Sequence, residues 1–149
     1  MTVCNSDILA ITQNVLETMV NMGVCEGEVA AACSQEERMT GCVQISGTWR
    51  GAVVIQTTEG FVRHAAREML DIAEADVTPE DMEDTLAEIT NMIGGNIKSQ
   101  VPSPSYLSLP SVTTGHDFNF RLTGAEIVSQ MPMNSHNQPL NVLICEGRE

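Results

Sequence analysis

Residues 78–100 read TPEDMEDTLAEITNMIGGNIKSQ, a pattern that predicts one long amphipathic helix. Thr78 is suited to cap the helix and Pro79 to occupy its first turn, and the two acidic residues that follow favour the positive end of the helix dipole. The apolar residues recur at spacings of three and four, so they form one stripe facing a core: Met82, Leu86, Ile89, Ile93 and Ile97. We expect the helix to end near Gln100, just before Val101-Pro102.

A second stripe lies almost opposite the apolar one and consists of Asp84, Glu88, Asn91 and Gly95. Polar residues on an outward stripe are by themselves only a solvated face. The pair Gly94-Gly95 is unusual, because each glycine costs a helix about 1 kcal/mol relative to alanine. Gly94, nearer the core side, would let another element pack closely, whereas Gly95 would leave room for a second backbone beside Glu88 and Asn91. The alternative is that the pair marks a kink or an early helix end.

Periodicity along the rest of the chain predicts two more helices and several strands. The first helix begins at a cap formed by Ser6 or Asp7, continues to Met22 and stops at Gly23, and another helix covers residues 59–70. Alternating apolar runs predict strands at 39–46, 49–57, 106–114, 116–122, 125–133 and 140–146. Gly47-Thr48 is typical of a tight hairpin, and residues 134–138 are typical of the turn of a closing hairpin.

Helices interleaved with hairpins predict an α+β fold, with a largely antiparallel β-sheet packed with three helices. The length of 149 residues and the hydrophobic content of 42% suit one domain over residues 1–149. No apolar run reaches membrane-spanning length, and the first residues do not resemble a signal peptide. We therefore expect a cytoplasmic protein.

The charge balance excludes some classes of partner. Seven basic against twenty acidic residues give a net charge of −13, and residues 59–88 alone carry −8. Such a surface repels phosphate backbones and anionic lipids, so we expect neither nucleic acid nor a membrane as partner. A partner bearing lysine, arginine or a divalent cation suits it better, although most of these acids are expected simply to be solvated.

No pattern of cysteine or histidine predicts a metal site. The five cysteines are odd in number and scattered without a CxxC pair, which favours reduced thiols packed as small hydrophobic residues. His64, His116 and His136 lie far apart in the sequence. We expect no metal ligands.

The outward stripe carries a motif. Asp84-xxx-Glu88-xx-Asn91, continued by Gly95-Asn96-Ile97-Lys98, resembles the signature of the CheX/CheC/FliY phosphatases of bacterial chemotaxis. The chain departs from the usual pattern at Pro110, which follows Asn91 by fewer residues and indicates a shorter loop.

Other segments resemble family landmarks in the same order and cover nearly the whole chain. They are Glu17-Thr18-Met19, Gly47-x-x-x-Gly51 leading into Val53-Val54, and Leu109-Pro110-Ser111-Val112 ahead of Gly115. The first helix has no second Glu-xx-Asn, because Glu17 and Asn21 are four residues apart. The resemblance is therefore to the CheX type with a single active site, and not to the CheC type with two.

The resemblance implies an enzyme that removes the aspartyl phosphate from a CheY-like response regulator. Asn91 would position the hydrolytic water and Glu88 would contact a lysine of the regulator; both are the expected catalytic residues. Asp84 would add a docking contact, and Gly95 would leave room for the regulator's loops. The regulator brings its own Mg²⁺, so no cofactor of the phosphatase itself is expected.

Two further expectations follow from the same resemblance. CheX relatives can pair as homodimers through sheet edges, and we expect this here. The alternative function is a non-catalytic module of the same fold that binds a response regulator or a component of the flagellar motor. An intact Glu88-xx-Asn91 pair disfavours that alternative, because a scaffold has no need of the amide.

Overall fold

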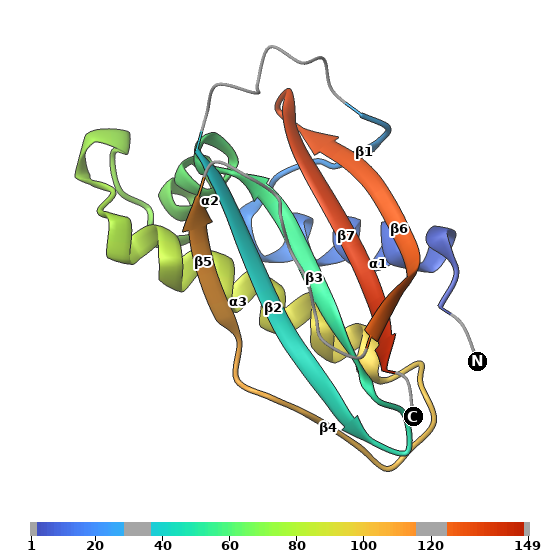
Figure 1. Cartoon of the computed structure of the whole chain (residues 1–149). Helices are drawn as coiled ribbons and strands as arrows, with labels where there is room; N and C mark the ends of the chain where they lie inside the picture. Colours follow the sequence, from blue (N-terminus) through green and yellow to red (C-terminus); the bar gives the residue numbers. More distant parts are fainter. Residues whose placement is uncertain (1–2, 29–36, 116–124, 148–149) are drawn as a thin grey trace.

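Within residues 3–28, 37–115 and 125–147, which the computed structural model describes, a seven-stranded sheet carries three α-helices on one face (Figure 1). The helical segments are α1 (Asn5–Val20), α2 (Glu59–Leu70), the 3-10 turn η2 (Glu74–Asp76) and α3 (Pro79–Lys98). The strands are β1 (Cys25–Glu26), β2 (Arg38–Gly47), β3 (Gly51–Thr58), β4 (Ser105–Leu107), β5 (Ser111–Gly115), β6 (Ala125–Ser135) and β7 (Gln138–Gly147). The predicted strand at 116–122 lies outside the described residues.

The sheet is antiparallel throughout its described part. Its order is β1-β6-β7-β3-β2, with β4 and β5 both paired to the far edge of β2. Strands β6 and β7 are joined at His136 and Asn137, whose positive φ angles of 52° and 63° are typical of a hairpin turn that follows the twist of the strands. The predicted α+β fold is confirmed.

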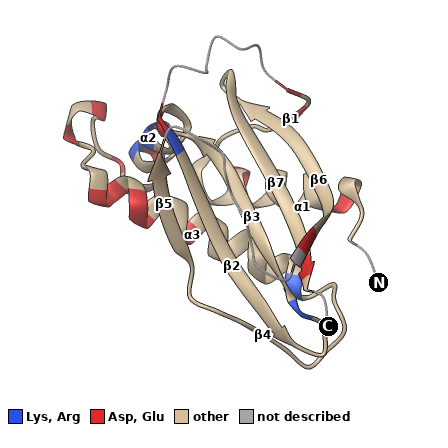
Figure 2. Ribbon diagram, in the orientation of Figure 1, with Lys and Arg blue, Asp and Glu red and all other residues tan. Residues whose placement is uncertain are grey.

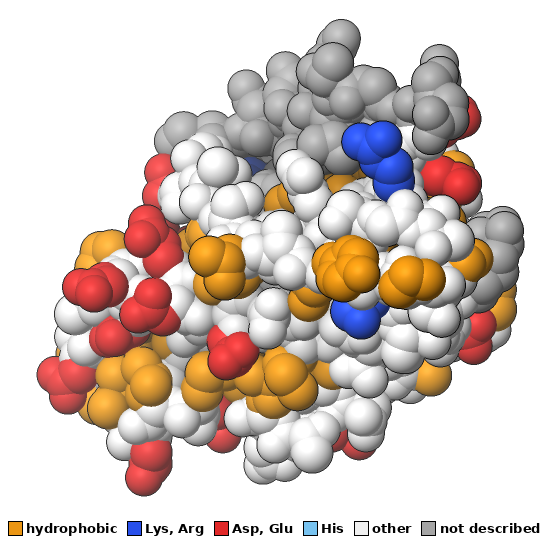
Figure 3. All heavy atoms as spheres, turned by 90° about the horizontal axis from the view of Figure 1, so that it is seen from below, with side chains coloured by type: hydrophobic (Ala, Val, Ile, Leu, Met, Phe, Trp, Pro, Cys, Tyr) orange, Lys and Arg blue, Asp and Glu red, His pale blue; other side chains and the backbone are white. Residues whose placement is uncertain are grey.

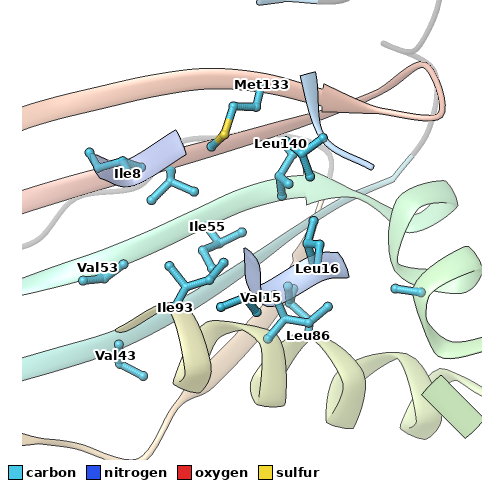
Figure 4. Packing of buried hydrophobic residues seen from close by; sticks show 14 of the residues in the cluster. Ile8, Val15, Leu16, Val43, Val53, Ile55, Leu86, Ile93, Met133 and Leu140 are labelled. Carbon is cyan, nitrogen blue, oxygen red and sulfur yellow. The ribbon is translucent and has the colours of Figure 1, made fainter. Parts of the chain in front are cut away.

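The core fills the space between the helices and the inner face of the sheet. Leu86 and Ile93 of α3, Val15 and Leu16 of α1 and Ile55 of β3 meet there, each at most 3% exposed (Figure 4). Burial of such side chains contributes about 1.5–3 kcal/mol each, so this contact holds α3 against the sheet. No helix in the described ranges is both long and apolar enough to cross a membrane.

The first hairpin has a longer turn than the sequence predicts. Gly47 ends β2 with a φ of 108°, a conformation that favours glycine, and β3 begins only at Gly51. Trp49, which we expected at the start of the strand 49–57, lies in this turn and is 7% exposed. Its ring lies against Gly51 and belongs to the hydrophobic core.

Helix α1 begins earlier and ends earlier than predicted. The residue before its first turn is Cys4, so the prediction of Ser6 or Asp7 as the cap is wrong; both lie inside the first turn. The helix ends at Val20, and Asn21, which takes the left-handed conformation, follows its end in place of the predicted stop at Gly23. By contrast, α2 has the predicted bounds, 59–70.

Helix α3 begins as predicted. The Thr78 hydroxyl accepts a hydrogen bond from the Asp81 backbone N–H at 3.0 Å, and the Asp81 carboxylate accepts one from the Thr78 N–H at 3.0 Å. These two bonds form a capping box. The helix continues through Gly94-Gly95 to Lys98, two residues short of the expected end, so the glycine pair does not mark an early end.

A histidine pair joins α2 to the β6–β7 turn. The rings of His64 and His136 are stacked, with their centroids 4.4 Å apart. Burial lowers the pKa of His64, as does the charge that His136 acquires on protonation; Arg67 lowers it further, while Glu68 and Glu74 oppose the change. The folded protein therefore favours the neutral imidazole.

We expect acidification to destabilise the fold through His64. Because its pKa is lower in the folded than in the unfolded chain, the unfolded state binds more protons as pH falls through about 6.5, and stability is lost in that window. Urea unfolding between pH 7.5 and 5.5 measures the effect, and His64→Gln should flatten the profile. An unchanged profile in the variant would show that other groups cause any loss.

Candidate functional site

Helix α3 turns its predicted outward stripe away from the core. The buried residues of its apolar stripe are Met82, Leu86, Ile89, Ile93 and Ile97. On the other side, Asp84 and Glu88 are exposed, and Asn91 and Gly95 are half-buried. The structure therefore places all four of the expected site residues along one accessible line of the helix.

Two glycine contacts bring α3 close to β2. A Cβ on Gly41 of β2 would overlap the Thr90 hydroxyl of α3, and a Cβ on Gly94 of α3 would overlap the Val43 Cγ2 of β2. Thr90 and Val43 are both fully buried. Because close-packed contacts of this kind leave a helix little freedom, the outward stripe is held in a fixed position relative to the sheet.

The segment that faces the outward stripe of α3 was predicted to be one strand, 106–114, and the structure differs there. Ile45 of β2 pairs with Leu107 and Cys42 pairs with Ser111, so residues 108–110 oppose only Val43 and Gln44. The extra residue interrupts the ladder, and two short strands, β4 and β5, replace the single predicted one. The interruption lies at the edge of the sheet, on the side of α3.

Hydrogen bonds hold this interruption in place. The Ser108 N–H donates to the Gln44 carbonyl, and the Gln44 N–H donates to the Ser108 hydroxyl, both at 2.9 Å. The same hydroxyl donates to the Leu109 carbonyl at 3.0 Å. Leu109 and Pro110 therefore lie on a braced segment between two paired strands.

The helix and this segment enclose an open groove of about 270 Å³. Its lining residues are Asp84, Ala87, Glu88, Asn91, Leu109 and Pro110. Three of the four expected site residues thus line one groove, and Gly95 lies on the same stripe outside that lining. Leu109 and Pro110 are the residues that the sequence did not assign to the site, although both belong to a segment that resembles the family.

The amide of Asn91 is available for a ligand. Among the described residues, none is hydrogen-bonded to its side chain, whereas Asn96 on the same helix donates its amide N–H to the Met92 carbonyl at 2.8 Å. Asp84 and Glu88 likewise form no ion pair within the described ranges. The groove therefore offers one neutral amide and two carboxylates that have no partner in the described part of the chain.

Acidic residues are concentrated around the N-terminal half of α3. Figure 2 shows Asp and Glu gathered over η2 and the first half of α3. In Figure 3 the same region carries acidic side chains interleaved with hydrophobic ones. A surface of this composition attracts a cationic partner and offers it apolar contacts as well.

The described residues hold no cluster of three or more potential metal ligands. Cys4, Cys25, Cys42 and Cys145 are free thiols, while Cys33 and His116 lie outside the described ranges. Burial raises the pKa of Cys145; it also raises that of Cys42, where the neighbouring Cys145 adds to the effect. Raised pKa values disfavour the thiolate and hence reactivity.

Known proteins share this fold. The family model described as chemotaxis phosphatase CheX matches residues 39–134. CheX from Vibrio vulnificus has a TM-score of 0.75 at 24% identity, covering 93% of this chain and 92% of its own. CheX from Desulfovibrio desulfuricans has a TM-score of 0.74 at 22% identity, covering 93% of this chain and 95% of its own. A chain of the CheX-CheY-BeF3-Mg²⁺ complex from Borrelia burgdorferi has a TM-score of 0.68 at 18% identity, covering 95% of this chain and 96% of its own. No curated protein matches the chain.

Proposed function

Because the chain belongs to the family of the chemotaxis phosphatase CheX, we propose that it hydrolyses the aspartyl phosphate of a CheY-like response regulator. The observation that carries this proposal is the groove in which Glu88 and Asn91 are both accessible, with the Asn91 amide unpaired among the residues that the structure describes. The Borrelia burgdorferi structure contains CheX together with CheY, and we carry that class of partner over to this chain.

Asn91 has the chemistry to hold the attacking water. Its carbonyl oxygen accepts a hydrogen bond from the water, and its N–H₂ donates one to a phosphoryl oxygen. Water then attacks phosphorus, the bond to the aspartate oxygen breaks, and the products are inorganic phosphate and the free carboxylate. An amide is neutral and does not repel the anion, but it takes up no proton near pH 7. Asn91 therefore contributes by positioning the attacking water.

Glu88 has the chemistry to dock the regulator. It lies one helical turn before Asn91, is exposed, and has no ion-pair partner among the described residues. We assign it to a lysine of the regulator, which would form a charge-assisted hydrogen bond and orient α3 over the phosphorylated aspartate. Asp84, one turn earlier, extends the contact at the edge of the groove, and Gly95 leaves room at the other end.

The experiment that tests the proposal is phosphate release from a phosphorylated CheY-like protein, with and without the chain. Acceleration at catalytic amounts of the chain supports a phosphatase. Binding that is independent of phosphorylation and occurs without turnover supports the alternative, a non-catalytic module of the same fold. The proposal fails if CheY-like regulators are neither bound nor hydrolysed.

Glu88→Gln should weaken docking more than chemistry. The substitution keeps the size of the side chain but removes the charge, so KM should rise about tenfold while kcat changes little. Glu83→Gln is the matched control, because Glu83 is also exposed on α3 but lies on another side of the helix. Equal KM values for the two variants would contradict the role of Glu88.

A homodimer through a sheet edge stays a prediction. Its support lies in β6, which in the described ranges has β7 along one side but only the two-residue β1 along the other. On that strand Ile127 is 55% and Val128 is 38% exposed. Exposed apolar residues at an open edge favour pairing with a second chain.

A further inference from the structure

Leu109 is the most exposed large hydrophobic residue in the described part of the chain. Its exposed fraction is 90%, compared with 62% for Tyr106 and 44% for Leu70. Solitary exposed leucines are common on protein surfaces and need no explanation. Leu109 differs from them because it lines the groove that holds Glu88 and Asn91.

The backbone around Leu109 is held on both sides. The hydrogen bonds between Ser108 and Gln44 brace one side, and Pro110 restricts the other. Its carbonyl is bonded to the Ser108 hydroxyl. A side chain presented on a braced segment loses little backbone entropy when a partner covers it, which makes it an effective anchor.

The groove therefore has two unlike walls. The α3 wall is polar, with Asp84, Glu88 and Asn91, and the opposite wall is apolar, with Leu109 and Pro110. A partner that fits both walls carries a cationic group for the carboxylates and, beside it, an apolar side chain for Leu109. Charge complementarity favours the docked response regulator as this partner, rather than a second copy of a chain whose net charge is −13.

We propose that Leu109 is a docking residue that packs against an apolar side chain of the response regulator next to the group that Glu88 binds. This inference rests on the proposed function and deepens it. Leu109 contributes binding energy equally to the substrate complex and to the transition state, because it lies across the groove from the reacting water. Its loss should therefore change KM and not kcat.

The test is Leu109→Ser, with Leu70→Ser as the matched control on a surface away from the groove. The probe is purified CheY loaded with Mg²⁺ and beryllofluoride for binding, and phosphorylated CheY for turnover. Leu109→Ser should raise Kd and KM about tenfold and leave kcat within twofold. Leu70→Ser should change none of them. Thermal unfolding of both variants should match wild type, because neither side chain belongs to the core.

Each other outcome overturns the inference. If wild type hydrolyses phosphorylated CheY and Leu109→Ser does so with an unchanged KM, the proposed function stands and the docking role fails. If wild type neither binds nor hydrolyses CheY, both fail together. If Leu109→Ser instead dissociates a wild-type dimer in light scattering, with KM unchanged, the occupant of the apolar wall is a second copy of this chain.

Discussion

Asn91→Ala is expected to reduce the rate of phosphate release from phosphorylated CheY to nearly that of the regulator alone. Loss of one preorganised hydrogen-bonding group at a reacting centre typically costs about a hundredfold or more in kcat, or about 2.7 kcal/mol. The amide is half-buried at the groove and unpaired among the described residues, so its removal leaves no buried group unsatisfied. Stability and binding should therefore be preserved. Single-turnover phosphate release and a titration with beryllofluoride-loaded CheY measure the two effects separately.

The matched control is Asn96→Ala on the same helix. Asn96 carries the same side chain, but its amide N–H is bonded to the Met92 carbonyl and its position lies off the outward stripe. It should retain the wild-type rate. Equal rates for Asn91→Ala and wild type would disprove water positioning by Asn91, and equal losses in both variants would indicate a general disturbance of α3.

The α3 wall of the groove can be predicted from sequence because helix geometry is local. Thr78 and Asp81 cap the helix three residues apart, and spacings of three and four determine which residues face outward. Asp84, Glu88 and Asn91 therefore share a face whatever the rest of the fold does. The bounds of α2 follow from the same kind of local pattern.

The opposite wall cannot be predicted in this way because it depends on a distant strand. The alternating pattern over residues 106–114 is compatible with one continuous strand, and only pairing with β2 shows that it is interrupted. Ser108 is bonded to Gln44, 64 residues earlier in the chain. Trp49 is a similar case, since its place in the turn follows from packing into the core rather than from its neighbours.

The two neighbouring glycines of α3, Gly94 and Gly95, have different tertiary contacts. The sequence places Gly94 nearer the core and Gly95 on the outward stripe, but the effect of each glycine on stability depends on contacts with distant residues. In the structure, a Cβ on Gly94 would overlap the Cγ2 of Val43, a buried and stiff β-branched side chain. A Cβ on Gly95 would meet only the Leu107 Cδ2, at 4.0 Å, which is an ordinary contact.

Gly94→Ala and Gly95→Ala should therefore change stability in opposite directions. Overpacking at Gly94 should exceed the gain in helix propensity and lower the free energy of unfolding by about 1–2 kcal/mol. At Gly95 the same substitution should raise it by about 0.5–1 kcal/mol, because the helix gains alanine at no steric cost. Urea unfolding of the two variants measures both changes. A loss of similar size in both would contradict the packing of α3 against β2.

The functional role of Gly95 requires a bulkier side chain, because alanine adds little volume to the outward stripe. Gly95→Leu places a good helix former on the half-buried outward face, so the fold should remain stable. If the loops of the regulator approach α3 there, the added volume should hold them away from Glu88 and Asn91. The value of kcat/KM should then fall about tenfold or more, because small misplacements of a positioned water are costly. A stable Gly95→Leu variant with the wild-type kcat/KM would show that the regulator does not approach Gly95 closely, and would leave Asn91 and Glu88 to be judged by their own variants.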